Sequence, residues 1–227
     1  MNARVLSNDS ETPTTRRIRI ALDGEPFIYR SGQAATLSAG GATAPYSIAS
    51  TPGETRRHGW VEFLVKVDGT NRFGAIVESL APGAPVALNG PIGAFTLERA
   101  PDGGPLLFVA GGTGIVPLRS MIRDAIDGGR RGRLALVYSN RAPAEFAYLD
   151  ELNQLAADGR LTLTLTLTGN ADDWTHARGR AGISHLAEVV VPTTTAFICG
   201  PPAMVVELPR ALESLGLTRD RIVTESW

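Results

Sequence analysis

LLFVAGGTGIVP (residues 106–117) decides the fold of the second half of this chain. An apolar strand pattern runs into a glycine-rich turn, and Pro117 lies in the first turn of the helix that follows. Glycines permit positive φ and let a ligand approach the backbone closely. Amides at a helix start favour an anion such as pyrophosphate. No Gly-Lys-Ser/Thr follows, so this is not a Walker P-loop, and alone an ordinary tight turn is an equal interpretation.

Strand and helix patterns alternate around this stretch, from about residue 101 to the end of the chain. The predicted strands are 106–110, 134–138, 161–168, 195–198 and 221–224. The predicted helices are 118–126, 144–157, 185–190 and 203–215. This alternation indicates βαβ units and a mainly parallel sheet, which binds ligands at the carboxyl ends of its strands. The strict Leu/Thr alternation of 161–168 predicts a strand with one solvated face.

A second strand–turn–helix passage, FICGPPAM (residues 197–204), belongs to the same predicted sheet. It places the only cysteine, Cys199, at the carboxyl end of a strand. Taken alone, Cys199 is equally explained as a buried small residue beside a rigid turn. Two such loops at one edge of a parallel sheet favour a ligand-binding cleft. The chain ends at that edge with Glu225-Ser226-Trp227, where the tryptophan is either a core cap or a stacking residue.

The first half carries short strand patterns separated by turn residues, which predict a small antiparallel barrel. The strands are expected at 18–22, 35–37, 46–48, 60–67 and 85–88, with one helix at 74–80. Residues 1–15 are polar and without periodicity, which predicts a flexible N-terminus. The expected organisation is therefore a flexible segment over 1–15, a β-barrel domain over 16–100 and an α/β domain over 101–227.

Composition excludes several classes of function. The net charge of −1 provides no general attraction to nucleic acid or to a membrane surface. No apolar run approaches the roughly 20 residues that span a bilayer, and the start is not a signal peptide, so a cytoplasmic location is expected. A single cysteine excludes an intrachain disulfide and a cluster held by four thiolates of this chain. The three histidines lack metal-site spacing, and no metal is expected.

Together these motifs resemble those of the ferredoxin–NADP reductase superfamily, in the family's order over nearly the whole chain beyond about Arg16. The correspondence pairs the family's Arg-x-Tyr-Ser with Ala44-Pro45-Tyr46-Ser47, Gly-x-x-Ser with Asn71–Gly74, Gly-Pro-x-Gly with Gly90–Gly93, Gly-Gly-Thr-Gly-x-x-Pro with Gly111–Pro117, Cys-Gly-Pro-Pro with Cys199–Pro202, and glutamate-x-aromatic with Glu225 and Trp227. As a set the motifs are specific, although none is so singly.

The resemblance implies a flavin-binding antiparallel β-barrel followed by a Rossmann-like parallel α/β domain that binds NADH or NADPH. FAD is favoured over FMN because members of the family usually bind FAD. In the family, the tyrosine packs on the isoalloxazine and the serine sits near flavin N5. The implied cofactor-binding residues are Tyr46, Ser47, Ile48, Lys66, Arg72, Gly74, Ala75, Ile76, Gly90, Pro91, Gly112, Thr113, Gly114, Pro117, Ser139, Arg141, Cys199, Gly200, Pro201, Met204 and Trp227.

The implied reaction is hydride transfer from nicotinamide C4 to flavin N5, in which the cofactors carry the chemistry. Ser47, Cys199 and Glu225 are the implied catalytic residues, which orient the two rings. Trp227 is expected to cover the flavin until nicotinamide displaces it. The electrons must then pass to an external acceptor, such as a ferredoxin, an oxygenase component or a small oxidant. The oligomeric state stays open.

Two departures from the family keep alternatives open. Ala44 replaces the arginine that neutralises flavin phosphate, and Gly74 replaces a serine. A lost charge-assisted hydrogen bond costs ~1.5–3 kcal/mol, roughly ten- to a hundredfold in affinity. The alternatives are an NAD(P)H:flavin reductase with dissociable flavin and an electron-transfer or regulatory subunit of a larger complex. Arg141 could contact a 2′-phosphate, yet no second basic residue is near in sequence, which favours NADH slightly.

Overall fold

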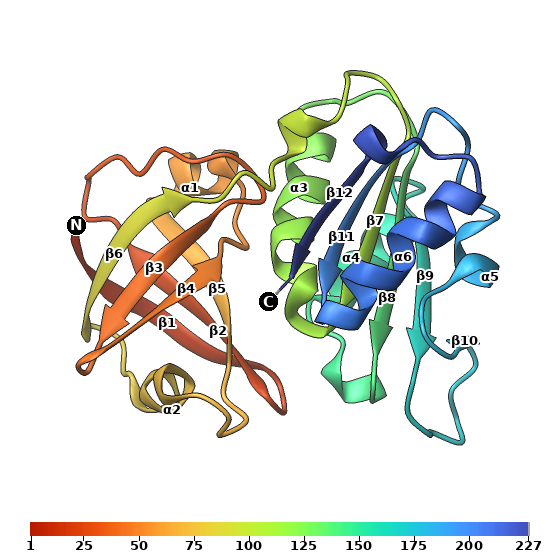
Figure 1. Cartoon of the computed structure of the whole chain (residues 1–227). Coiled ribbons are helices and arrows are strands. Elements are labelled where there is room, and N and C mark those ends of the chain that lie inside the picture. Colours follow the sequence, from red (N-terminus) through yellow and green to blue (C-terminus); the bar gives the residue numbers. More distant parts are fainter. Residues whose placement is uncertain (227) are drawn as a thin grey trace. The chain divides into compact units, whose positions relative to one another are not determined.

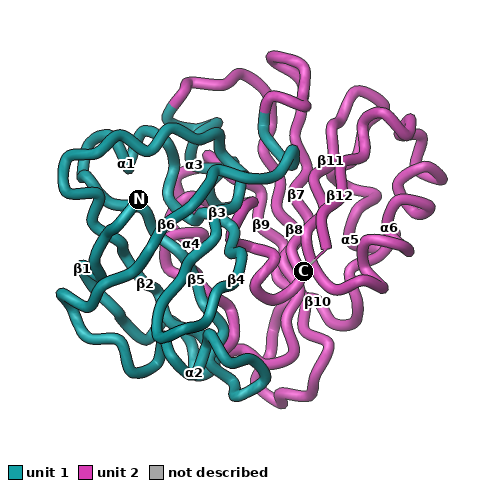
Figure 2. The backbone as a smooth tube through the Cα atoms, turned by 60° about the vertical axis from the view of Figure 1, so that its left-hand side comes forward, with its two compact units in different colours: residues 1–97, 119–127 teal, residues 98–118, 128–227 magenta. Residues whose placement is uncertain are grey.

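The computed structural model describes residues 1–226, which form two compact units (Figures 1 and 2). Unit 1 comprises residues 1–97 and 119–127, and unit 2 comprises residues 98–118 and the chain from 128 onward. The division therefore falls within helix α3 (Ile115–Asp127) instead of at a single point near residue 100. Among the described residues, no helix has the length and apolar character needed to cross a bilayer.

Unit 1 is built on a six-stranded antiparallel sheet with the order β4-β3-β6-β1-β2-β5. The strands are β1 (Asn2–Thr12), β2 (Thr15–Ala21), β3 (Ala34–Ala39), β4 (Ala42–Ser47), β5 (Trp60–Lys66) and β6 (Pro85–Ile92). Ile48, directly after β4, forms a bridge to Phe63 of β5, and the Ala49 amide donates to the Glu62 carbonyl at 2.8 Å. The two edge strands of the sheet thus meet, and the predicted antiparallel barrel is confirmed.

The expectation of a flexible N-terminus over residues 1–15 is wrong, because most of this segment forms strand β1. It lies between β6 and β2, and Val5 is buried in the barrel core with 2% of its surface exposed. The sequence did not show a strand pattern here, because several side chains of β1 are polar and form hydrogen bonds in the folded structure. The Asn8 amide donates to the carbonyls of Val77 and Leu80, and its oxygen accepts from Arg16 Nε at 2.7 Å.

Besides its part of α3, unit 1 contains two short helices. Helix α1 (Pro52–His58) was not expected, although Thr51 and Glu54 form a capping box at its start. Helix α2 (Arg72–Ser79) matches the expected helix to within two residues at its start, with Asn71 as its N-cap. Phe73 and Val77 of α2 are buried in the barrel core, so this helix closes one end of the apolar interior.

Unit 2 contains a six-stranded sheet with the order β10-β9-β8-β7-β11-β12, and every strand pair is parallel. Its strands are β7 (Leu106–Gly111), β8 (Leu134–Asn140), β9 (Thr162–Leu167), β10 (Ala177–Arg178), β11 (Thr195–Gly200) and β12 (Ile222–Ser226). Strands β7 and β11 are buried along their whole length, as expected of a parallel sheet covered on both faces. The predicted α/β architecture is confirmed.

The remaining helices of unit 2 are α4 (Leu149–Ala157), α5 (Ile183–Leu186) and α6 (Pro202–Ser214). Leu208 and Leu212 of α6 and Leu186 of α5 share one apolar core with Val109 and Val137 of the sheet. Helix α4 packs on β9. The solvated face predicted for 161–168 is wrong at Thr166, which is fully buried and donates from its hydroxyl to the Gly179 carbonyl at 2.7 Å.

The burial of β1 leads to a stability prediction for two adjacent apolar residues on opposite faces of this strand. Val5 is 2% exposed and Leu6 is 47% exposed. Val5→Ala should lower the free energy of unfolding by about 2 kcal/mol, because it leaves a cavity in the barrel core. Leu6→Ala serves as the matched control and should change stability by less than about 0.5 kcal/mol. Chemical denaturation measures both, and equal effects would contradict the placement of β1.

Candidate functional site

The strand order of unit 2 reverses between β7 and β11. From β7 the chain proceeds through β8 to β9 on one side, whereas β11 and β12 lie on the other. Ligands of open parallel sheets bind at such a switch point, outside the carboxyl ends of the strands. The glycine-rich loop Gly112–Gly114, a single 3-10 turn, follows β7, and Pro201 joins β11, which ends at Gly200, to α6. Both predicted loops therefore adjoin the switch point.

The two loops touch backbone to backbone. A Cβ atom on Gly114 would lie 2.1 Å from the Cys199 carbonyl oxygen and 2.9 Å from the Gly200 nitrogen. A Cβ atom on Gly200 would lie 2.7 Å from Sδ of Met204, and one on Gly111 would lie 2.8 Å from Cδ of Pro201. At Gly114 a Cβ would collide with main-chain atoms of the neighbouring loop, and at Gly111 and Gly200 it would collide with Met204 or Pro201, so these glycines let the two loops pack closely together. We call the paired loops Gly111–Gly114 and Cys199–Met204 the cradle. This arrangement suits the backbone approach that a dinucleotide requires.

Other predicted residues lie at or beside the same edge. Gly112 and Thr113 are half-buried on the loop, whereas Pro117 is buried in the first turn of α3 and shapes the helix start. Ser139, one residue before the end of β8, is in register with Gly111 and is 6% exposed. Arg141 follows β8 and is exposed. A Cβ on Gly169 would meet the Arg141 carbonyl at 2.1 Å, so the loops after β8 and β9 are also in close contact.

Cys199 and Glu225 are brought together by strand register, since they are paired residues of β11 and β12. Burial raises the pKa of the Cys199 thiol well above its usual value, and the Glu225 charge adds to this effect. The thiol is therefore protonated, which excludes a thiolate nucleophile and leaves a packing or hydrogen-bonding role. Burial also raises the pKa of Glu225 to about 7. Trp227 lies outside the described residues.

In unit 1, the predicted flavin residues share neighbouring strands. Tyr46 and Ser47 of β4 are in register with Ala35 and Ala34 of β3. Tyr46 is half-buried, its ring centroid lies 5.4 Å from that of Phe73, and burial raises its pKa.

Gly90 and Pro91, which the sequence places in a turn, lie instead within strand β6, next to β3 in the same sheet. A Cβ on Gly90 would lie 3.2 Å from the Ala35 Cα, and Gly90 and Pro91 are both exposed. Ile48 differs from the other predicted residues. The whole residue is buried in the barrel core with 0% of its surface exposed, and its amide donates to the Gln33 carbonyl at 2.9 Å, so Ile48 offers no surface to a ligand.

The start of α2 differs from the expectation that the Gly74, Ala75 and Ile76 amides face a phosphate. The Gly74 amide donates to the Asn71 side-chain oxygen at 2.6 Å, and the Ala75 amide points to the Asn71 carbonyl at 3.4 Å. The Ile76 side chain lies 3.2 Å from the Cβ position of Gly40. By helix geometry, the amides at Arg72 and Phe73 remain without an intrahelical partner.

The same region explains the glycine at position 74. A Cβ there would lie 2.2 Å from the Lys66 carbonyl oxygen, so serine cannot occupy this position without a backbone shift. The Lys66 ammonium forms an ion pair with Asp68 at 2.7 Å and helps to lower the pKa of that carboxyl to about 2. Arg72 is exposed, with a guanidinium nitrogen 3.8 Å from the Cβ position of Gly41.

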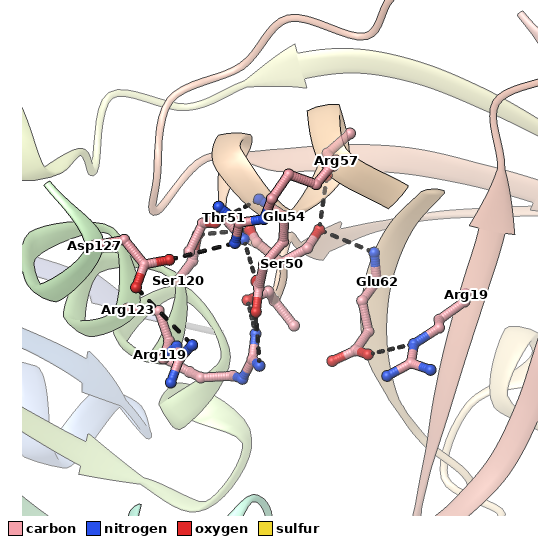
Figure 3. Close-up of polar contacts among 12 residues, drawn as sticks. Arg19, Ser50, Thr51, Glu54, Arg57, Glu62, Arg119, Ser120, Arg123 and Asp127 are labelled. Carbon is pink, nitrogen blue, oxygen red and sulfur yellow. Dashed lines mark hydrogen bonds and ion pairs between the residues drawn. The ribbon is translucent and has the colours of Figure 1, made fainter. Parts of the chain in front are cut away.

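A buried polar cluster within unit 1 was not predicted from the sequence; Figure 3 labels Ser50, Thr51, Glu54, Arg119 and Ser120 of it. Its members are Tyr29, Ser50, Thr51, Glu54, Thr55, Arg119 and Ser120. One signal was present, because Thr-x-x-Glu at 51–54 is the capping-box pattern. The partners on α3 had no signal, since they lie at least 65 residues away along the chain.

Comparison with known proteins places this geometry in a family. Residues 108–208 match the family described as "Oxidoreductase NAD-binding domain". The ferredoxin–NAD(P)(+) reductase component of the Pseudomonas putida naphthalene 1,2-dioxygenase system is 31% identical over 98% of this chain and 67% of its own length. Ferredoxin–NADP reductase B of Sorangium cellulosum is 31% identical over 99% of this chain and 96% of its own.

A solved structure shares the fold of the whole chain. The Amycolatopsis cytochrome P450 reductase GcoB has a TM-score of 0.85 and 27% identity, over 100% of this chain and 69% of that one. Its fold agrees with an antiparallel barrel unit followed by a parallel α/β unit. From the switch-point loops, the barrel and these relatives together, the chain belongs to the ferredoxin–NADP reductase family of NAD(P)H-dependent oxidoreductases.

Proposed function

We propose that this chain is a flavoprotein reductase that takes hydride from NADH or NADPH and passes electrons through bound FAD to an external redox partner. The observation that carries the proposal is the close contact between the two switch-point loops. A Cβ atom added to Gly114 would lie only 2.1 Å from the Cys199 carbonyl oxygen. This packing holds two strand–helix loops side by side at the switch point of the sheet, which is where open parallel sheets bind dinucleotides.

On the nicotinamide side, the chain's own groups bind and orient. The Gly112, Thr113 and Gly114 backbone stands at the start of α3, where amides and the helix dipole favour a pyrophosphate. Gly200, Pro201 and Met204 form the opposite wall of the cradle. Ser139 and Arg141 extend the edge toward the position that an adenosine ribose would take.

Cys199 and Glu225 are paired at the ends of β11 and β12. Cys199 supplies a protonated thiol, and Glu225 supplies a carboxyl group that can be protonated. Cys199 contributes a neutral, buried thiol beside the cradle. With a pKa of about 7, Glu225 exchanges its proton in the neutral range and can donate or accept a hydrogen bond there. We assign the pair to the placement of the nicotinamide ring, and Trp227 keeps its proposed role in covering the flavin.

On the barrel side, Tyr46 offers a half-buried ring for stacking, and Ser47 lies next to it at the end of β4. Arg72 and the amides at the start of α2 are the groups we assign to flavin phosphate, in place of the arginine absent at Ala44. Gly90 and Pro91 are exposed residues near the end of the same sheet's strand β6. FAD supplies the hydride-accepting and electron-releasing chemistry, and these residues hold it.

The electron acceptor is proposed as a ferredoxin or an oxygenase component. Its support is that two relatives are named as reductase components, one of a naphthalene 1,2-dioxygenase system and one of a propane 2-monooxygenase from Rhodococcus jostii. A second candidate, a flavin reductase with dissociable flavin, is favoured by one feature of α2. The Gly74 amide is already used by Asn71, which leaves fewer groups for a flavin phosphate.

The purified chain should therefore be yellow, keep its flavin through gel filtration and lose its visible flavin band when NADH is added without oxygen. Retention of flavin separates the two candidates, because a dissociable flavin elutes apart from the protein. The apparent dissociation constant of FAD should be lowered by Ala44→Arg and raised by Arg72→Ala. A colourless chain that neither binds added FAD nor oxidises NADH would overturn the proposed function.

Gly114→Ala tests the cradle. The added methyl group would fall 2.1 Å from the Cys199 carbonyl, so the loops must separate. The dissociation constant for NADH should rise about tenfold or more, with flavin content unchanged. Gly104→Ala is the matched control in the same unit, because its Cβ would meet nothing nearer than the Thr193 carbonyl at 3.5 Å. Unaltered NADH affinity in a folded Gly114→Ala protein would remove the cradle from the site.

The pKa of Glu225 predicts a pH dependence for oxidised nucleotide. Below about pH 7 the carboxyl is protonated and neutral, and above it is a carboxylate. The oxidised nicotinamide ring is cationic and the reduced ring is neutral, so only the oxidised form gains attraction from the charge. Affinity for oxidised nucleotide should rise as the pH increases through about 7. Glu225→Gln should flatten this profile in fluorescence titrations, and a variant with the wild-type profile would exclude Glu225 as the titrating group.

A further inference from the structure

Four consecutive residues directly after Tyr46 and Ser47 are fully buried and belong to neither a strand nor a helix. Ile48, Ala49, Ser50 and Thr51 all have 0% of their surface exposed. Irregular backbone in an interior is unusual, because its carbonyls and amides lack the regular partners of secondary structure. The amides of Ile48 and Ala49 donate to the carbonyls of Gln33 and Glu62, whereas the carbonyls of Ala49 and Ser50 accept from side chains. Each group left unpaired would cost about 1–3 kcal/mol, so the conformation at Ala49 and Ser50 depends on those side chains.

Side chains of α3 supply two of those partners. Arg119 donates from Nη1 to the Ala49 carbonyl at 2.7 Å, and Ser120 donates from Oγ to the Ser50 carbonyl at 2.8 Å. The Tyr29 hydroxyl donates to the Ser50 carbonyl as well, at 3.0 Å. Figure 3 shows Arg119 and Ser120 projecting from α3 toward Ser50 and Glu54.

The Arg119 charge is balanced by Glu54. Two guanidinium nitrogens lie 3.3 Å from the two carboxylate oxygens, and both residues are buried, at 7% and 9% exposure. One Glu54 oxygen also accepts from the Thr51 amide at 2.7 Å. Burial opposes ionisation of Glu54, but the Arg119 charge and the Thr51 amide outweigh it and hold its pKa below the usual value. Arg119 therefore contacts the segment at two places, at Ala49 directly and at Thr51 through Glu54.

We infer that Arg119 is a positioning residue for flavin binding: with Glu54 it fixes the backbone of Ile48–Thr51, and thereby the placement of Tyr46 and Ser47. This inference rests on the proposed function, in which Tyr46 and Ser47 contact the flavin. Breaking a buried ion pair is costly, yet a well-packed apolar pair is often as stable as an intact one. Stability alone thus gives weak reason for this pair, whereas directional hydrogen bonds to two sites of one segment define its conformation.

The first test measures FAD binding to flavin-free protein. The variant Arg119→Met/Glu54→Gln removes the ion pair without leaving a lone buried charge. Its dissociation constant for FAD should rise about tenfold, and the shape of the visible band of bound FAD should change. Ser120→Ala, which leaves the charges intact, should produce a smaller change in the same direction.

Arg57→Gln is the matched control. Arg57 of α1 forms an ion pair with Asp127 of α3 at 3.5 Å, so it joins the same two helices, but its side chain is 56% exposed. FAD affinity and the visible band should stay as in the wild type. A change as large as that of Arg119→Met/Glu54→Gln would mean that any contact between these helices matters, and would overturn the specific role of Arg119.

A double-mutant cycle distinguishes positioning from general support of the fold. If Arg119 acts through Tyr46, the tenfold effect should shrink to about twofold or less in a Tyr46→Ala background, since the ring to be positioned is gone. Ser47→Ala provides a second background if Tyr46→Ala abolishes binding. Fully additive effects in either background would overturn the inference while leaving the proposed function intact. A wild-type chain without affinity for FAD would overturn both.

Discussion

Direct main-chain contact between the loops after β7 and β11 is the constraint on which the α/β unit depends. Because the Gly114 position abuts the Cys199 carbonyl, no side chain can be placed between the helix start and the neighbouring strand end without pushing them apart. The register of β11 and β12 then brings Glu225 beside Cys199 at the same edge. Glycines here act chiefly by lacking a side chain, since of the glycines at 111, 112, 114 and 200 only Gly112 has a positive φ, of 54°.

In the barrel unit, by contrast, side chains provide hydrogen-bond partners for buried main-chain groups that secondary structure does not pair. Buried irregular chain after β4 is stabilised by hydroxyl, guanidinium and carboxylate groups at short distances. The departures from the family have a related physical basis. Gly74 is required by the nearby Lys66 carbonyl, so the usual serine is excluded by packing, and Asn71 caps the helix instead. The chain thus holds the start of α2 close to β5 at the expense of one phosphate-binding group.

Sequence patterns predicted most strands because their side chains alternate or are continuously apolar, as in residues 106–111. They failed where polar residues bond to distant parts of the chain. Asn8 looked like a residue of a loose end, but its amide binds carbonyls of α2 about 70 residues later. The motif order identified residues of the cradle and of β4. The cap at Asn71 and the contacts of Arg119 were not predictable, because they depend on tertiary distances that no local pattern encodes.

The division of α3 between the two units has a consequence for biosynthesis. Residues 1–97 leave the ribosome before α3 exists, so the interior carbonyl of Ala49 has to wait for Arg119, and the carbonyl of Ser50, which Tyr29 can already bond, still waits for Ser120. The first unit can therefore mature only after translation has passed through the first strand of the second. Folding of the two units is interleaved in time, and a gene fragment that stops near codon 100 would encode a barrel with an unfinished interior.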